Sequence, residues 1–242
     1  MEHGAASSVP APRPLSEQAA ANLRHPLSLV LLALTFSTGT VDAVSYLGLG
    51  HVFTANMTGN VVLLGFGIAR AGGLPIVAPI VSLAAFVVGS GVGGAIARRL
   101  ADRHPTHVGS ALAVEAALLA CATVAAATTH PHPTTFAADV TIALMAAAMG
   151  VRNATVRRLA VPDLTTTVLT MTITALAVES TLSGGSGKGT LRRTSAIAAM
   201  LAGAVAGAFM LRTGLTLPLA FAAALALATC AAYLSVQQRR PA

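Results

Sequence analysis

Long apolar runs alternate with short polar stretches along most of this chain. A bilayer core of about 30 Å needs about 20 helical apolar residues, and several runs reach that length. Eight apolar segments can be distinguished: roughly 27–49, 53–69, 75–97, 108–129, 135–156, 164–182, 195–212 and 215–236. The second and the sixth are the shortest or most polar of these, because they contain clusters of Thr, Asn and Gly. The pattern predicts an all-α integral membrane protein with two segments unlike the rest.

The composition supports a membrane protein and argues against a nucleic-acid partner. Hydrophobic residues make up 55% of the chain and charged residues only 10%, whereas soluble domains have about 25% charged residues. The net charge is +7, but the basic residues form short clusters between the apolar runs. Such clusters are typical of loops that orient a protein in the lipid bilayer, so nucleic acid is not expected to bind.

The apolar runs define one membrane domain with a tail at each end. Residues 1–26 are rich in Ala, Pro and Ser and lack an apolar core, which predicts a disordered cytoplasmic tail and not a signal peptide. Residues 27–236 form the predicted transmembrane domain, and residues 237–242 a short cytoplasmic C-terminal tail.

The second half of the membrane domain repeats the polar pattern of the first half. The run from Gly39 to Ala43, with Asp42 as its fourth residue, returns as the run from Gly150 to Ala154, with Asn153 in the place of Asp42. A threonine-rich segment follows each run. The pattern predicts two repeats, residues 27–129 and 135–236. A glycine pair also occurs in each repeat and fits close helix packing: Gly89 and Gly93, then Gly203 and Gly207.

The basic residues favour six crossings over eight. If all eight segments cross, the fifteen Lys and Arg residues divide almost evenly between the two sides. If segments 53–69 and 164–182 instead enter and leave on one side, only Arg70 and Arg212 lie outside. Cytoplasmic loops collect Lys and Arg. We therefore expect about six transmembrane helices plus two re-entrant or broken segments, with both termini cytoplasmic and the second repeat inverted relative to the first.

Two carboxylates within the apolar segments are candidates for carrying a coupling proton. A carboxylate inside a span costs about 2.5 to 3.5 kcal/mol on insertion scales and usually faces a bundle interior or a cavity. Asp42 fits this role, although a backbone amide or a nearby hydroxyl could equally hold it in place. Glu115, in the fourth segment, is either a second proton site or a partner for Arg152.

The polar clusters of the two repeats are candidates for binding a small solute. Inverted repeats place a shared site near the bilayer midplane, where broken helices expose polar groups. The alternative is that the threonines bond the carbonyl one turn back and that Asn and Gly mark a helix break. The candidate substrate-binding residues are Asn56, Thr58, Gly59, Asn60, Thr167, Thr170 and Asn153.

The sequence does not predict an enzyme. The stretch Gly184-Gly185-Ser186-Gly187 resembles the serine motif of intramembrane rhomboid proteases, but no histidine follows it. The histidines and cysteines also lack the spacing of a metal site. No catalytic residue, cofactor or metal is therefore expected.

Two motifs carry a resemblance to a known family. They are Gly39-x-x-Asp42-Ala43 through the run Val52 to Asn60, and Met149-Gly150-x-x-Asn153-Ala154 with Thr167-x-x-Thr170. In both, the chain resembles the YoaK family, also called the DUF1275 family, over nearly all of residues 27–236. That resemblance implies a bacterial multi-pass membrane protein of about six spans, and it names no substrate.

These observations favour a secondary transporter in the bacterial inner membrane. Its expected partners are the lipid bilayer, a small solute of unidentified chemistry and, as an open alternative, further copies of the chain. The competing hypothesis is a non-transporting membrane module that assembles through its glycine faces. That module would bind a cytoplasmic partner or anionic lipid through the basic loops 98–107 and 183–193.

Overall fold

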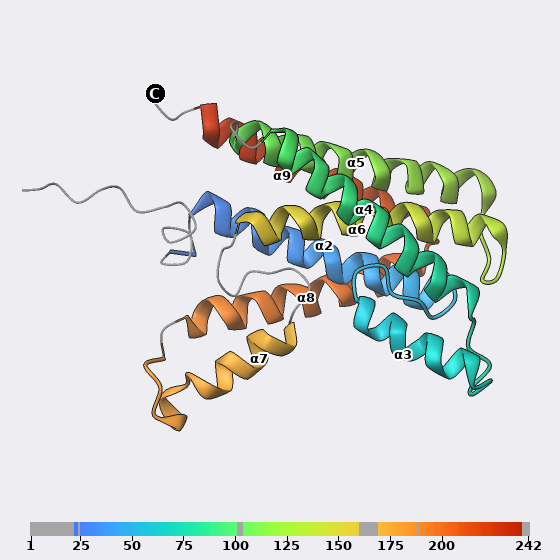
Figure 1. The fold of residues 1–242 in the computed structure, drawn as a ribbon, viewed down its shortest axis with the longest axis horizontal. Coiled ribbons are helices and arrows are strands. Elements are labelled where there is room, and N and C mark those ends of the chain that lie inside the picture. The colour runs from blue at the N-terminus through green and yellow to red at the C-terminus, as the bar shows by residue number, and fades with distance from the viewer. Residues whose placement is uncertain (1–21, 24, 101–103, 160–168, 188, 239–242) are drawn as a thin grey trace, which may run out of the picture.

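The computed structural model describes residues 22–23, 25–100, 104–159, 169–187 and 189–238. Nearly all of the predicted N-terminal tail lies outside this part of the chain. All regular structure within it is helical, which confirms the predicted class (Figure 1). The α-helices are α2 (Pro26–Gly48), α3 (Met57–Ile68), α4 (Val77–Arg99), α5 (His104–Thr129), α6 (Phe136–Leu159), α7 (Leu169–Val178), α8 (Thr190–Leu211) and α9 (Thr216–Gln238), with a 3-10 turn η1 (Thr181–Ser183) between α7 and α8.

Five of these helices are long and apolar enough to cross a membrane: α2, α4, α5, α8 and α9. Helix α6 has 24 residues and is equally long, but it is less apolar because it carries Asp139, Arg152, Arg157 and Arg158. Two of these charges are in its last turn, where arginines interact favourably with the negative end of the helix dipole. The number of crossings and the inverted repeat remain predictions.

Helices α2 and α6 occupy the centre of the bundle. Helix α4 packs along α6 and α8 packs along α2, while α5 contacts α6 and α9, and α9 contacts α2. Helices α2, α5 and α8 run in one direction along the bundle, and α4, α6 and α9 run in the other (Figure 1). Most of α2 is therefore buried, whereas α4 and α8 are largely exposed on the outside.

The repeated glycines lie where two helix backbones approach each other. A Cβ atom added at Gly89 would overlap the backbone of Ala147 in α6, and one added at Gly203 would overlap the backbone of Phe36 in α2. Small residues permit such close approach between membrane helices. The predicted role of these glycines in packing is thus confirmed, and the contacts are within one chain. Gly93 and Gly207 make similar contacts one turn further along, at Val151 and Thr40.

The outer faces of the bundle are apolar, as contact with lipid requires. Large apolar side chains are exposed along the helices that cover the bundle, as expected where a helix faces lipid. The exposed residues include Val87, Val88 and Val92 of α4, and Leu201, Val205 and Phe209 of α8.

Within the described residues, helices α3 and α7 are each shorter than a bilayer core is thick. They have 12 and 10 residues, and a helix rises about 1.5 Å per residue against a bilayer core of about 30 Å. Each begins beside the middle part of the bundle and runs toward one end: α3 toward the end where α2 finishes, α7 toward the opposite end (Figure 1). Helix α3 packs on α4, and α7 packs on α8. The predicted segments 53–69 and 164–182 therefore contain shorter helices than their length suggested.

Most of the basic residues in the described part of the chain lie at one end of the bundle. The last turns of α4 and α6 and the first turn of α8 are at the same end (Figure 1), and they carry Arg98 and Arg99, Arg157 and Arg158, and Arg192 and Arg193. Arg70 follows α3 and Arg212 follows α8 at the opposite end.

Candidate functional site

Asp42 of α2 anchors the segment that leads into α3. The backbone N–H groups of Thr54 and Ala55 donate hydrogen bonds of 3.0 and 2.9 Å to its Oδ1 atom. These amides precede the helix and lack a helical partner, so a buried acceptor is needed to satisfy them. Asp42 is only 6% exposed. The backbone-anchoring alternative for Asp42 is therefore present in the structure.

Asn60 holds the same segment from the other side. Its Oδ1 accepts a hydrogen bond from the N–H of Phe53 at 2.9 Å, and its Nδ2 donates to the carbonyl of Phe53 at 2.6 Å and to the hydroxyl of Ser82 at 3.0 Å. The side chain is fully buried. Since its amide is bonded within the chain, Asn60 positions the segment. Its contact with a solute stays a prediction.

Asn56 marks the start of α3. Its Oδ1 accepts a hydrogen bond of 3.3 Å from the N–H of Gly59, an N-cap contact that satisfies one of the free amides of the first turn. A Cβ atom at Gly59 would crowd the ring of Phe53 and the side chain of Asn56. The Asn-Met-Thr-Gly run is thus a helix start pressed against the preceding segment.

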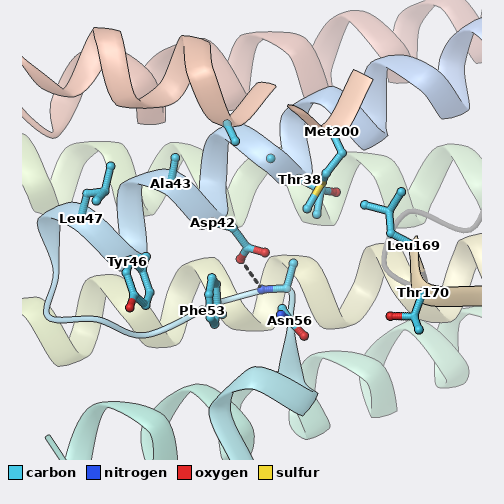
Figure 2. A pocket seen from close by; sticks show the side chains of 13 residues that line it. Thr38, Asp42, Ala43, Tyr46, Leu47, Phe53, Asn56, Leu169, Thr170 and Met200 are labelled. Carbon is cyan, nitrogen blue, oxygen red and sulfur yellow. Dashed lines mark hydrogen bonds between the residues drawn. The ribbon is translucent and has the colours of Figure 1, made fainter. Parts of the chain in front are cut away.

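A cavity of about 430 Å³ lies between α2, α8 and the starts of α3 and α7 (Figure 2). Three residues predicted from the sequence line it together: Asp42, Asn56 and Thr170. The structure thus brings the two short helices to one site, and each contributes residues at its N-terminal end. The complete lining is Thr38, Gly39, Asp42, Ala43, Tyr46, Leu47, Phe53, Ala55, Asn56, Leu169, Thr170, Met200 and Ala204.

A second hollow of about 590 Å³ shares four lining residues with this cavity, namely Tyr46, Phe53, Asn56 and Thr170. Its remaining wall belongs to α3 and includes the predicted residues Thr58 and Gly59. The predicted polar cluster of the first repeat therefore borders two adjoining spaces on the same side of the bundle.

Of the remaining predicted solute-binding residues, Asn153 lines neither cavity. It is in α6, where its Nδ2 donates to the carbonyl of Met149 one turn back at 2.8 Å. Thr167 is outside the described residues.

Glu115 and Arg152 form an ion pair in the interior of the bundle. Nε of Arg152 donates to Oε1 of Glu115 at 3.0 Å, and both side chains are fully buried. The guanidinium also donates to three groups on α2: the carbonyl of Leu34 at 2.9 Å, the hydroxyl of Thr38 at 2.9 Å and the hydroxyl of Ser37 at 3.1 Å. Of the two alternatives for Glu115, the partnership with Arg152 is observed, and a proton-carrying role remains a prediction.

This network reaches the wall of the cavity. Thr38 accepts a hydrogen bond from Arg152 and also lines the space beside Asp42. Within the described residues, Oε2 of Glu115 is buried without a hydrogen-bond partner. Helices α2, α5 and α6 are thereby linked through one polar cluster at the side of the cavity.

Sequence reasoning missed Thr38, Tyr46, Phe53 and Met200 as cavity residues. Thr38 and Tyr46 are four residues before and after Asp42, so helical spacing places all three on one face of α2 and could have identified them. Tyr46 stacks on Phe53, with ring centroids 4.9 Å apart and ring planes 22° apart. Met200 comes from α8, and no local pattern in the sequence connects it with Asp42.

Comparison with known proteins identifies a family but not an activity. No solved structure matches the chain. The UPF0700 transmembrane protein YoaK of Bacillus subtilis (strain 168) is 36% identical over 152 residues, which cover 61% of this chain and 64% of that protein. The match therefore spans slightly less than two thirds of the relative's length. The family described as "Protein of unknown function (DUF1275)" matches residues 30–232, almost the whole helical region. The chain is thus a multi-pass membrane protein that belongs to the DUF1275 family.

Proposed function

We propose that this protein is a secondary transporter that moves a small solute across a bacterial inner membrane, with the cavity beside Asp42 as its solute site. The observation that carries the proposal is the meeting of two half-length helices at one cavity. Helix α7 contributes residues of its first turn and α3 contributes its N-cap residue Asn56, and a buried carboxylate lines the same space.

The cavity has the size and lining of a small-molecule site. Such sites measure about 300 to 1,000 Å³ and combine an apolar wall with a few placed polar groups. Here the volume is about 430 Å³, and the polar side chains among the lining residues are Thr38, Asp42, Tyr46, Asn56 and Thr170. Irregular backbone at membrane depth is tolerated where it lines a cavity or is covered by protein. The segment that precedes α3 meets that condition through its bonds to Asp42 and Asn60.

An arrangement of about six spans in two inverted repeats supports alternating access to this site. In transporters of this kind, one repeat rocks against the other around a fixed binding site. The equivalent helices α2 and α6 run in opposite directions, as do α4 and α8 (Figure 1). The equivalent contacts of Gly89 with Ala147 and of Gly203 with Phe36 agree with such a pseudo-two-fold relation.

The distribution of arginines supports cytoplasmic N- and C-termini. Lys and Arg collect in cytoplasmic loops, and the end of the bundle where α2 begins and α9 finishes carries the arginines of α4, α6 and the start of α8. We propose that this end faces the cytoplasm and that Asp42 carries a coupling proton when the solute site changes sides.

The glycine contacts weaken the competing hypothesis of a non-transporting module. That hypothesis assigned the glycine pairs of α4 and α8 to assembly with other proteins, but they pack within the chain against α6 and α2. In the basic loop 183–193, Arg193 pairs with Glu179 of the same chain. We keep transport as the proposal because the module offers no account of the cavity.

The test is proton movement driven by solute in proteoliposomes that contain the full chain and an internal pH indicator. A panel of cationic, neutral and anionic solutes is added across an imposed pH gradient. We expect at least one solute class to move protons with the unaltered protein. Asp42→Asn should abolish this movement, because the amide cannot carry the proton, although its oxygen can still accept from Thr54 and Ala55.

The matched control is Asp139→Asn, which makes the same chemical change in the first turn of α6, away from the cavity. It should leave the proton movement unchanged. Proton movement that persists in Asp42→Asn at normal protein levels would remove Asp42 from the mechanism. A panel in which no solute moves protons or is itself accumulated would contradict transport.

A further inference from the structure

Asp42 presents a carboxylate oxygen that the protein itself does not use. Both backbone amides that anchor the following segment donate to Oδ1, and Oδ2 has no hydrogen bond within the described residues. The carboxylate is more than nine-tenths buried and lines the cavity beside Phe53 and Asn56 (Figure 2). Oδ2 is not among the fully enclosed atoms that lack a partner, so it is accessible from the cavity. A ligand that brings a donor into the cavity can therefore bond to it.

The charges around the cavity leave Asp42 uncompensated. Among the cavity's described lining residues, Asp42 is the one with an ionisable carboxyl group, and no Lys, Arg or His is among them. The nearest described cation in the network is Arg152 on α6, and its charge is balanced by Glu115 on α5. When Asp42 is ionised, the cavity therefore has a net negative charge in an apolar surround, where a charge acts more strongly than in water.

The lining favours an organic cation over a metal ion. Calcium and magnesium require about six or more oxygen ligands, and the described residues contain no group of three or more His, Cys, Asp or Glu side chains able to hold a metal. Most of the wall is apolar, with Met200, Leu47 and Leu169 around the space. The stacked pair Tyr46 and Phe53 adds aromatic surface, which attracts cations through the ring quadrupole.

An anion would be poorly accommodated at this position. The amides of Thr54 and Ala55 are already bound to Asp42, and that of Gly59 is bound to Asn56. These three donors are therefore engaged, and a negatively charged solute would approach the carboxylate of Asp42 without a counter-charge from the lining residues.

We propose that the cavity binds a monovalent organic cation, a protonated amine on an apolar or aromatic body, with Oδ2 of Asp42 as its counter-ion and Tyr46 and Phe53 as its aromatic wall. This inference rests on the proposed function in that it names the solute class of the same site. Because one oxygen accepts either the ammonium group or a proton, the two compete for Asp42, which links solute binding to proton release.

The experiment measures equilibrium binding to the purified full chain in detergent with three probes that share a phenyl body: 2-phenylethylamine, 2-phenylethanol and 3-phenylpropanoate. Binding is followed by the concentration-dependent rise in thermal midpoint, which reports an apparent Kd. We expect saturable binding of the amine, and binding of the alcohol and the carboxylate that is weaker by about tenfold or more, as for the loss of a charge-assisted hydrogen bond.

Asp42→Asn should weaken the binding of the amine by a similar factor and leave the binding of the alcohol unchanged. Asp139→Asn should alter the binding of neither probe. The probe series on the unaltered chain tests the charge preference even if Asp42→Asn does not fold. Equal or tighter binding of the alcohol or the carboxylate, amine binding that survives in Asp42→Asn, or no saturable amine binding would each overturn the inference.

This experiment is independent of the transport assay because it needs no gradient. If only neutral or anionic solutes drive proton movement and this movement depends on Asp42, the proposed transport function stands and the cationic solute class is overturned. Selective amine binding without any solute-driven proton movement would keep the binding site and contradict transport.

Discussion

At the residue scale, the most consequential contact is the buried ion pair of Arg152 and Glu115. The pair is fully buried, and Arg152 adds three hydrogen bonds to α2. Removing one partner of such a pair leaves an uncompensated charge in a low-dielectric interior, while replacing both with apolar groups of similar volume can be nearly neutral. Variants that remove one partner of the pair should therefore be strongly destabilised, even though the net contribution of the intact pair to stability is small.

We expect Glu115→Leu alone to lower the free energy of unfolding by about 3 to 5 kcal/mol, because Arg152 is then buried without a counter-charge. The double variant Glu115→Leu with Arg152→Met should recover most of this loss. Unfolding in mixed micelles, followed by circular dichroism, measures the three free energies. A double variant less stable than Glu115→Leu would show that the hydrogen bonds from Arg152 to α2 outweigh the cost of burying the pair.

The comparison is the ion pair of Arg193 and Glu179, in which the Arg193 side chain is 6% exposed and that of Glu179 is 49% exposed. Water reaches one partner of this pair, and ion pairs in contact with solvent contribute about 0 to 1 kcal/mol. Glu179→Gln should therefore change the stability far less than Glu115→Leu, and an equal loss would contradict the role of burial in this comparison.

At the element scale, the bundle depends on two close helix interfaces, α4 with α6 and α8 with α2. Each relies on glycines that let one helix touch the backbone of the other. Lipid supplies no hydrophobic driving force between helices, so close packing and hydrogen bonds hold them together. Ser90 of α4 adds such a bond to the carbonyl of Gly150 at 3.3 Å, and Thr40 of α2 to the carbonyl of Gly203 at 3.0 Å.

We expect Gly89→Ala to destabilise the bundle by about 1 to 3 kcal/mol, because the new Cβ atom overlaps the backbone of Ala147 and forces α4 away from α6. Gly91→Ala is the control in the same helix. An added Cβ atom there meets nothing within 4 Å, so helix propensity alone should leave stability unchanged or raise it by about 1 kcal/mol. Thermal unfolding in detergent compares them, and equal midpoints would contradict the close contact at Gly89.

At the scale of the whole molecule, the arrangement across the membrane decides between six and eight crossings. Arg157 at the end of α6 and Arg70 after α3 are both exposed and lie at opposite ends of the bundle. With six crossings, Arg157 is cytoplasmic and Arg70 external. With eight crossings, both positions exchange sides.

We expect a single cysteine at Arg70 to react with a membrane-impermeant thiol reagent in intact cells, and one at Arg157 to react only after permeabilisation. Labelling of protein from intact and opened cells measures this, in a background where Cys121 and Cys230 are changed to Ala, because Cys121 is exposed. The reverse pattern would contradict the proposed orientation, in which six crossings leave both termini in the cytoplasm.

The sequence by itself determined the class, the family resemblance and the positions of the packing glycines. These features follow from local composition and spacing, because apolar length and small residues act wherever the helices finally pack. It also singled out Asp42, Asn56 and Thr170, since polar residues in a lipid setting are costly and stand out. Two residues expected to contact a solute, Asn60 and Asn153, form hydrogen bonds within the chain. Those of Asn60 satisfy the irregular backbone before α3.

Only the tertiary structure decided which of these polar groups share a cavity. Met200 of α8 lines the same cavity as Asp42 of α2, although the two are far apart in the sequence. Arg152 of α6 bonds to Glu115 of α5 and Thr38 of α2. Such contacts depend on how the helices cross, which the close approach at the glycines sets. The structure likewise shows that Oδ1 of Asp42 accepts hydrogen bonds from the amides of Thr54 and Ala55, which leaves Oδ2 for a ligand. The sequence pattern identifies polar residues whose burial in a membrane is costly, and the packing of the helices determines which groups compensate that cost.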